Sequence, residues 1–170
     1  ACHVLVNKLA GATKVIVADV SDTRLAEIAR IGADVTINSA NTDLVKAVMK
    51  ETDGRGCDVV ITACSVPEVQ GVALQAAAGH GRVNFFGGMP SGKEMGLLNT
   101  NLIHYKELVV LGTTGSSLSD FQRSVEIAAS GRVALRELVT AQFPIENTKE
   151  AFEYAASGTG MKAVVVMGEE

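Results

Sequence analysis

The chain has 170 residues, of which 47% are hydrophobic and 20% charged, and its net charge is −4. This is the balance of a globular protein that can bury a core. No two Lys or Arg residues are adjacent, and no apolar stretch approaches the roughly 18 residues that cross a bilayer. We therefore expect neither a nucleic-acid partner, which needs clustered basic side chains, nor a membrane.

Apolar runs and helical periodicity alternate from the first residues onward. Short runs rich in β-branched residues are typical of buried parallel strands, and the stretches between them repeat every three to four residues. The first third of the chain predicts a helix over 1–10, a strand over 14–19, a helix capped by Ser21 or Asp22 and ended by Gly32, a strand over 34–38 and a helix over 41–51.

The middle of the chain continues this alternation. The expected elements are a strand over 57–63, a helix over 67–78, a strand over 82–86 that runs into Gly87, a strand over 108–112 and a helix over 119–129. Five strands thus precede residue 113. Strands and helices that alternate in this way predict an α/β fold, a Rossmann-like doubly wound parallel sheet with helices on both faces.

The tail changes character. It predicts a strand over 138–143, a turn over 144–146, a helix over 147–156, a loop over 157–160 and a last strand over 162–167. This shorter piece is expected to be a separate C-terminal segment.

Asp19 is the most informative residue. In a dinucleotide-binding fold, an acid at the end of the second strand accepts hydrogen bonds from the adenosine ribose of NAD and repels the 2′-phosphate of NADP. The alternative is that Asp19 only ends a strand or caps the next helix. That acid stands about 20 residues after a glycine fingerprint, which places the first strand and its glycine loop at or before residue 1.

One literal glycine fingerprint is present, Gly158-Thr-Gly-Met-Lys-Ala163. It follows an expected helix and precedes an expected strand. Pyrophosphate binding needs the reverse order, because the phosphates must meet a helix N-terminus. We therefore reject this match.

Cysteine and histidine are sparse. Three cysteines without C-x-x-C spacing predict reduced, partly buried thiols, and no pair of histidines has metal-ligand spacing. We expect no metal site within this chain.

Several stretches, in this order, resemble the zinc-dependent medium-chain alcohol and polyol dehydrogenases. They are KVIVADVSDTRLAEIARIGADVTI, GCDVVITACS, GRVNFFGGMPSG, NTNLIHYKELVVLGTTGS and FPIENTKEAFEYAASGTGMKAVVVM. The HYKE stretch and the Asp19/Arg24 pair resemble most the sorbitol (L-iditol) and threonine dehydrogenase branch.

The resemblance implies a set of cofactor-binding residues. They are Asp19 for the adenosine ribose, Arg24 beside the adenine, Ala63, Cys64 and Ser65 on the adenine side of the cleft, Gly87, Gly88 and Met89 at the nicotinamide, Thr113 and Thr114 near the carboxamide, and Lys162 at the pyrophosphate. Each has a plainer alternative. Arg24 would be an exposed residue paired with Glu27, Lys162 a surface lysine, and the others ordinary strand ends and turns.

The resemblance also implies the organisation of the parent protein. Residues 1–113 would be an incomplete NAD-binding Rossmann domain, and 114–170 a linking helix and the C-terminal segment that returns to the catalytic domain. The catalytic zinc ligands and the proton relay would lie in an N-terminal domain outside this chain. The fragment alone would then be inactive, and it carries no expected catalytic residue.

In the strand order 3-2-1-4-5-6 of a doubly wound sheet, the missing first strand is central. Its absence would leave two unpaired strand edges inside the sheet. A longer polypeptide, a rearranged fragment or another chain could account for the gap, and the sequence leaves these open.

The implied function is a cytoplasmic oxidoreductase that oxidises a secondary alcohol or polyol by hydride transfer to NAD, as a homodimer or homotetramer that pairs through residues 108–111. Two alternatives remain open. One is a stand-alone nucleotide-binding module. The other is a zinc-free, NADPH-dependent relative of the quinone reductases, against which Asp19 argues.

Overall fold

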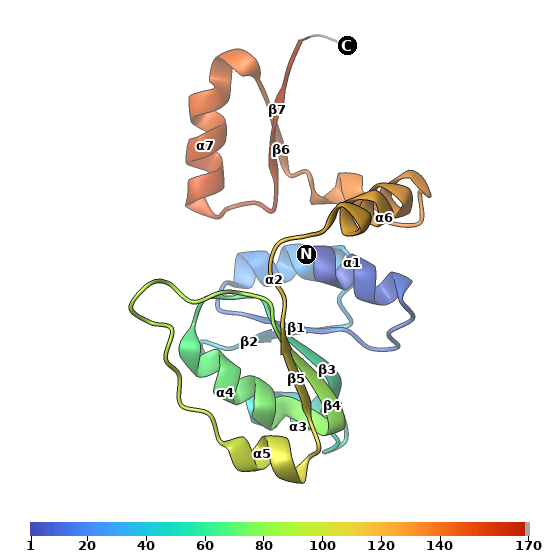
Figure 1. The fold of residues 1–170 in the computed structure, drawn as a ribbon. Coiled ribbons are helices and arrows are strands. Elements are labelled where there is room, and N and C mark those ends of the chain that lie inside the picture. Colours follow the sequence, from blue (N-terminus) through green and yellow to red (C-terminus); the bar gives the residue numbers. More distant parts are fainter. Residues whose placement is uncertain (169–170) are drawn as a thin grey trace. The chain divides into compact units, whose positions relative to one another are not determined.

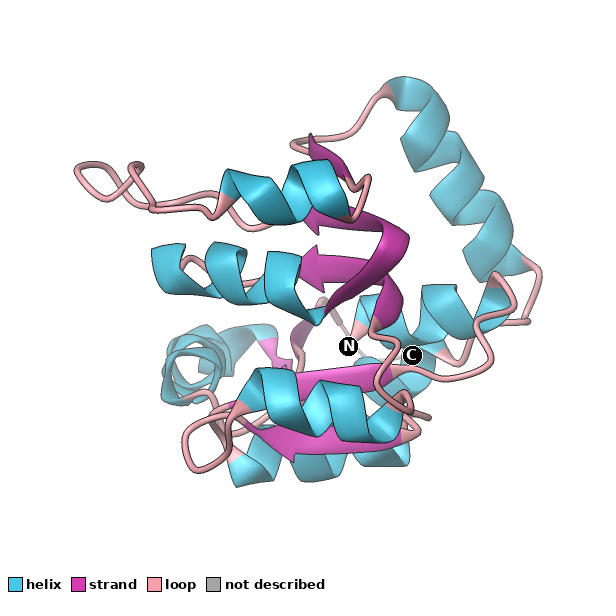
Figure 2. Cartoon of the chain, turned by 90° about the horizontal axis from the view of Figure 1, so that it is seen from below, coloured by secondary structure: helices cyan, strands magenta, loops and turns pink. Residues whose placement is uncertain are grey.

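The computed structural model describes residues 1–168. The chain divides into two compact units. Unit 1 joins Ala1–Asn41 to the segment from Ser117 onward, and unit 2 is the continuous stretch Thr42–Ser116. Figure 1 colours the chain by residue number, so that the two stretches of unit 1 can be followed in blue and in orange to red. Figure 2 shows the helices and strands by type.

Unit 1 contains two pairs of parallel strands. Its elements are α1 (Cys2–Leu9), β1 (Ile16–Asp19), α2 (Asp22–Arg30), β2 (Val35–Asn38), α6 (Leu118–Ala129), the 3-10 helices η1 (Leu135–Leu138) and η2 (Ile145–Asn147), β6 (Ala141–Pro144), α7 (Thr148–Ser157) and β7 (Ala163–Val166). Strand β1 pairs with β2, and β6 pairs with β7.

The main core of unit 1 joins its two sequence segments. Val4 from α1, Val15 before β1, and Ile28 and Ile31 on or beside α2 pack together with Leu138 at the end of η1. Burying such side chains stabilises by roughly 1.5 to 3 kcal/mol each. The start of the tail is therefore held against α1 and α2 by apolar packing.

Unit 2 is a three-stranded parallel sheet with helices. Its elements are α3 (Leu44–Glu51), β3 (Cys57–Thr62), α4 (Pro67–Ala76), β4 (Ala77–Phe85), α5 (Thr100–Tyr105) and β5 (Val109–Gly112). The strand order is β3–β4–β5, which makes β5 an edge strand. Leu74 of α4 and Val83 of β4 are completely buried in the core of this unit.

Two charged side chains tie elements together within their units. Lys8 of α1 forms an ion pair with Asp34, and the Asp34 carboxylate also accepts from the backbone nitrogen of Val15 at 2.6 Å. In unit 2, Lys106 Nζ donates to the carbonyl oxygens of Leu74, Gln75 and Ala77, at 3.3, 2.8 and 2.7 Å. Lys106 thus satisfies carbonyls at the C-terminal end of α4, which the helix itself leaves unpaired.

The α/β class and the parallel strands are confirmed, with five strands before residue 113. The described strands form three sheets, β1–β2, β3–β4–β5 and β6–β7. No helix within residues 1–168 is both long enough and apolar enough to cross a membrane.

One helix was not predicted, and two predicted strand boundaries were wrong. Helix α5 was not predicted, because six residues are too few to show helical periodicity. The expected strand over 138–143 begins only at Ala141, since Leu138 ends a 3-10 helix and points into the core. Strand β4 begins at Ala77, five residues before the predicted start, because Ala77 already pairs with Cys57.

Candidate nucleotide-binding site

Asp19 lies at the carboxyl end of β1, where the chain turns into α2. Its Oδ1 accepts a hydrogen bond from the backbone nitrogen of Ser21 at 3.0 Å. The cap of α2 is Ser21, whose side chain accepts from the backbone nitrogen of Arg24. Asp19 therefore does not cap the helix. One carboxylate oxygen fixes the turn, and Oδ2 accepts no hydrogen bond from any residue between 1 and 168.

A pocket of about 340 Å³ opens beside Asp19, within unit 1. This volume lies in the range of small-molecule sites, which starts near 300 Å³. The pocket is lined by Ala1, Asp19, Arg24, Ile28, Ala155, Gly158, Gly160 and Met161. Residues from β1 and α2 thus face residues from α7 and the loop that follows it.

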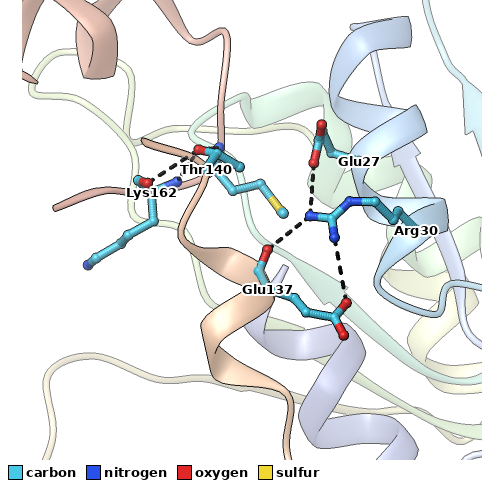
Figure 3. A network of polar contacts seen from close by, with 6 residues as sticks. Glu27, Arg30, Glu137, Thr140 and Lys162 are labelled. Carbon is cyan, nitrogen blue, oxygen red and sulfur yellow. Dashed lines mark hydrogen bonds and ion pairs between the residues drawn. The ribbon is translucent and has the colours of Figure 1, made fainter. Parts of the chain in front are cut away.

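Arg24 is exposed, as its plainer alternative expected, but the partner of Glu27 within residues 1–168 is a different arginine. Glu27 pairs with Arg30 at 3.2 Å, and Arg30 also donates to the carbonyl oxygen of Glu137 at 2.9 Å (Figure 3). The nearest neighbour that a Cβ at Gly158 would meet is Arg24 Nη2, at 2.8 Å. The guanidinium of Arg24 therefore lies against the loop that follows α7.

Lys162 stands at the start of β7, where Thr140 holds its backbone (Figure 3). The Thr140 hydroxyl donates to the carbonyl oxygen of Lys162 at 3.2 Å and accepts from the backbone nitrogens of Met161 and Lys162 at 3.1 and 3.3 Å. The side chain of Lys162 is exposed. The backbone around Lys162 is thus fixed while its ammonium group stays in solvent.

The remaining predicted residues belong to unit 2 and follow its three strands. They are Ala63, Cys64 and Ser65 after β3, Gly87, Gly88 and Met89 after β4, and Thr113 and Thr114 after β5. Because the strands are parallel, all eight lie at the same edge of the sheet, the edge at which α/β proteins bind ligands.

Hydrogen bonds connect the three strand ends. Gly87 donates its backbone nitrogen to the carbonyl oxygen of Thr62 at 2.8 Å, and the hydroxyl of Thr113 donates to Asn84 Oδ1 at 3.3 Å. The Thr62 hydroxyl reaches the carbonyl oxygen of Asn84 at 3.5 Å. Sequence reasoning missed Thr62 and Asn84, because both lie inside apolar strands with no motif around them.

Gly87 has a structural reason to be glycine. A Cβ there would stand 2.8 Å from the carbonyl carbon of Cys64 and 2.9 Å from its nitrogen, and would clash with its oxygen. A Cβ at Gly88 would meet nothing within 4 Å. The loops after β3 and β4 can therefore approach each other only because position 87 lacks a side chain.

The described residues do not fit a zinc ion. Within 1–168 no group of three or more His, Cys, Asp or Glu side chains could hold a metal. The three cysteines are free thiols, and burial raises the pKa of Cys57.

Parallel strands with an acidic residue at the end of β1 and polar, glycine-containing loops after β3, β4 and β5 define a Rossmann-like α/β protein. The sequence model of the zinc-binding dehydrogenases matches residues 1–130. The chain belongs to the zinc-binding dehydrogenase family, as its resemblance in sequence predicted.

Curated relatives extend the match almost to the end of the chain. L-threonine 3-dehydrogenases from Pyrococcus horikoshii and Pyrococcus abyssi are 36% and 34% identical over 166 residues, which is 96% of this chain and 47% of each relative. The crystal structure of L-idonate 5-dehydrogenase from Escherichia coli K-12 superposes with a TM-score of 0.80 at 26% identity, over 96% of this chain and 46% of that one. The chain spans about half the length of the relatives it matches.

Proposed function

We propose that this chain is the NAD-binding region of an oxidoreductase that oxidises a secondary alcohol, polyol or hydroxy amino acid by hydride transfer. In this proposal residues 1–113 bind the cofactor, and 114–170 form the linking helix and C-terminal segment. Support comes from the family, and from relatives whose names denote threonine and L-idonate dehydrogenases. NAD would supply the nicotinamide ring that takes up the hydride.

The observation that carries the proposal is the place of Asp19. Its carboxylate stands at the carboxyl end of a parallel strand, beside a pocket, with Oδ1 held by Ser21 and Oδ2 available as an acceptor. A carboxylate so placed can accept hydrogen bonds from both hydroxyls of a ribose. A 2′-phosphate would meet its negative charge, which favours NAD over NADP.

We assign the residues that follow the strands of unit 2 to both ends of the cofactor. Cys64 and Gly87 are packed against each other, and Asn84 fixes the hydroxyl of Thr113. These loops would orient the ring through backbone groups, with Thr113 and Thr114 beside the carboxamide. Ala63, Cys64 and Ser65 would line the adenine side, Gly88 and Met89 the ring, and Lys162 would reach the pyrophosphate.

Asp19→Asn tests the proposal directly. The substitution keeps the size of the side chain and an acceptor for Ser21, but it removes the charge. Hydrogen bonds to a charged group are worth about 1.5 to 3 kcal/mol, so we expect NADH to bind roughly 10- to 100-fold more weakly, with less loss for NADPH.

Titration calorimetry on the protein at its natural length measures both affinities, and Asp53→Asn in an exposed turn serves as control. A wild-type protein that binds no NADH, or that prefers NADPH, would contradict the proposal.

We also propose a homodimer or homotetramer that pairs through β5. This strand is an edge of its sheet, and Val109 and Leu111 are 53% and 38% exposed. An edge strand with exposed apolar side chains is suited to pairing with a second copy across a two-fold axis. Leu111→Lys should lower the mass measured by light scattering to that of smaller species, and an unchanged mass would argue against this interface.

A further inference from the structure

The tail loop 157–161 lies opposite Asp19 and Arg24 in the pocket of unit 1. We propose that this loop is the second wall of the adenosine subsite, and that Gly158 is a positioning residue that leaves room for the guanidinium of Arg24 beside it. The inference rests on the proposed function, and it assigns to the tail a role in cofactor binding beyond that of Lys162.

Gly158 ends α7 in a left-handed conformation, with a φ of 68° and a ψ of 15°. The three nearest atoms that a Cβ there would meet belong to the guanidinium group of Arg24, with Nη2 at 2.8 Å, Cζ at 3.8 Å and Nε at 4.0 Å. Any side chain at this position would push the guanidinium away. Glycine therefore permits both the turn and the close approach of Arg24.

At Gly160, the loop lies against side chains of the same C-terminal segment. A Cβ at Gly160 would collide with the hydroxyl groups of Tyr154 and Thr140. The Thr140 hydroxyl also accepts from the backbone nitrogen of Met161. The loop thus cannot shift to relieve a contact at Gly158 without breaking these interactions.

The pocket between these walls has the chemistry of a nucleoside site. Asp19 offers a carboxylate for ribose hydroxyls, and Arg24 offers a planar cation that can stack on a purine ring. Ile28 and Met161 add apolar surface, and the 340 Å³ volume is of small-ligand size. Because Gly158 has no side chain, the guanidinium can lie beside the loop where the adenosine would bind.

Gly158→Ala separates this contact from simple backbone strain, because the chain offers a matched control. Gly131, after α6, has a φ of 67° against 68° at Gly158, but a Cβ there would meet nothing within 4 Å. Both substitutions strain a left-handed residue, and only Gly158→Ala reaches Arg24. The probes are ADP-ribose and NADH, titrated into the protein at its natural length, with thermal unfolding followed in parallel.

We expect Gly158→Ala to weaken ADP-ribose and NADH binding alike, by roughly fivefold to tenfold, the effect of a displaced cation over an aromatic ring. Gly131→Ala should leave both affinities unchanged, with a similar shift in unfolding temperature. In an Arg24→Ala background, Gly158→Ala should have no further effect on binding, because the group it displaces is gone.

Equal affinities for Gly158→Ala and Gly131→Ala would overturn the inference, and so would a full effect that persists without Arg24. If Gly158→Ala does not fold, Gly158→Asn and Gly131→Asn replace the pair, since Asn tolerates the left-handed region better. A wild-type protein that binds neither NADH nor ADP-ribose would instead refute the proposed function itself.

Discussion

The neighbouring glycines at positions 87 and 88 differ in whether a side chain would fit there. Gly87 leaves room for the backbone of Cys64, whereas Gly88 faces open space. We expect Gly87→Ala to destabilise the protein by about 1 to 3 kcal/mol, because two backbone segments must separate. Gly88→Ala should stay within about 0.5 kcal/mol of wild type. Urea denaturation of the two variants measures the difference, and equal stabilities would show that the loops separate at little cost.

The carboxylate of Asp34 links stability to pH. Hydrogen bonds from Lys8 and from the backbone of Val15 hold its pKa below the ordinary 3.8. A carboxyl whose pKa is lower in the folded state stabilises the fold above its unfolded pKa, and this contribution is lost as the pH falls through the folded pKa. Asp34→Asn should therefore be less stable than wild type at pH 7, and the gap should close in acid below about pH 3.8.

Urea unfolding at pH 7 and pH 3 measures that gap, with Asp53→Asn at an exposed turn as control. A constant difference between wild type and Asp34→Asn at both pH values would show that the charge of Asp34 is not the cause.

Single residues could be predicted where a motif fixes their chemistry. Asp19 was placed correctly at a strand end, because an acid that closes an apolar run is visible in the sequence. The contact of Arg24 with Gly158 could not be foreseen, since it joins residues far apart in the chain. Local spacing suggested Glu27 as the partner, but Glu27 pairs with Arg30 instead.

At the scale of elements, α4 depends on a distant lysine. Lys106 donates to three carbonyl oxygens at the end of this helix, and burial lowers the pKa of its ammonium group. Lys106→Met keeps most of the apolar stem but removes the donors. We expect a loss of about 1.5 to 3 kcal/mol, the range for hydrogen bonds to a charged group.

Circular dichroism during urea titration measures this loss, with Lys93→Met in an exposed loop as control. If Lys106→Met and Lys93→Met unfold at the same urea concentration, the loss of the Lys106 ammonium group costs no stability, because water takes its place.

Elements with a clear periodicity of apolar residues or a clear helix cap could be predicted from the sequence. The helix after Ser21 and the strands that surround it lie where sequence patterns placed them. Helix α5 and the 3-10 helix η1 were missed, because each has six residues or fewer and no repeating apolar face. Leu138 illustrates the difficulty, since an apolar residue before a strand looks the same whether it continues the strand or fills a core.

At the scale of the molecule, unit 1 is assembled from two distant stretches, and Arg30 is their main polar link. It donates to the Glu137 carbonyl and pairs with the Glu137 carboxylate at 3.6 Å (Figure 3). Arg30→Ala should raise amide exchange in residues 135–143 more than in β1, because the apolar core around Val15 stays intact. Exchange followed by mass spectrometry checks this, and unchanged rates would mean that Leu138 alone holds the tail.

The general arrangement at this scale followed from the alternation of strands and helices, which predicted the α/β class and the parallel pairing. The packing of the tail against α1 and α2 could not be predicted, because it depends on Leu138 and Arg30 meeting partners more than a hundred residues away.

Because unit 1 is built from two separate stretches of chain, the two units become complete at different times during synthesis on the ribosome. Residues 42–116 emerge as one uninterrupted piece, whereas unit 1 stays without β6 and β7 until residues 141–166 have been translated. Chains grow at roughly 5 to 20 residues per second, and contiguous regions fold as they appear. Nascent chains in which residues 42–116 have left the ribosome should therefore already protect the β3–β5 region from protease, while α1 and α2 wait for β6 and β7.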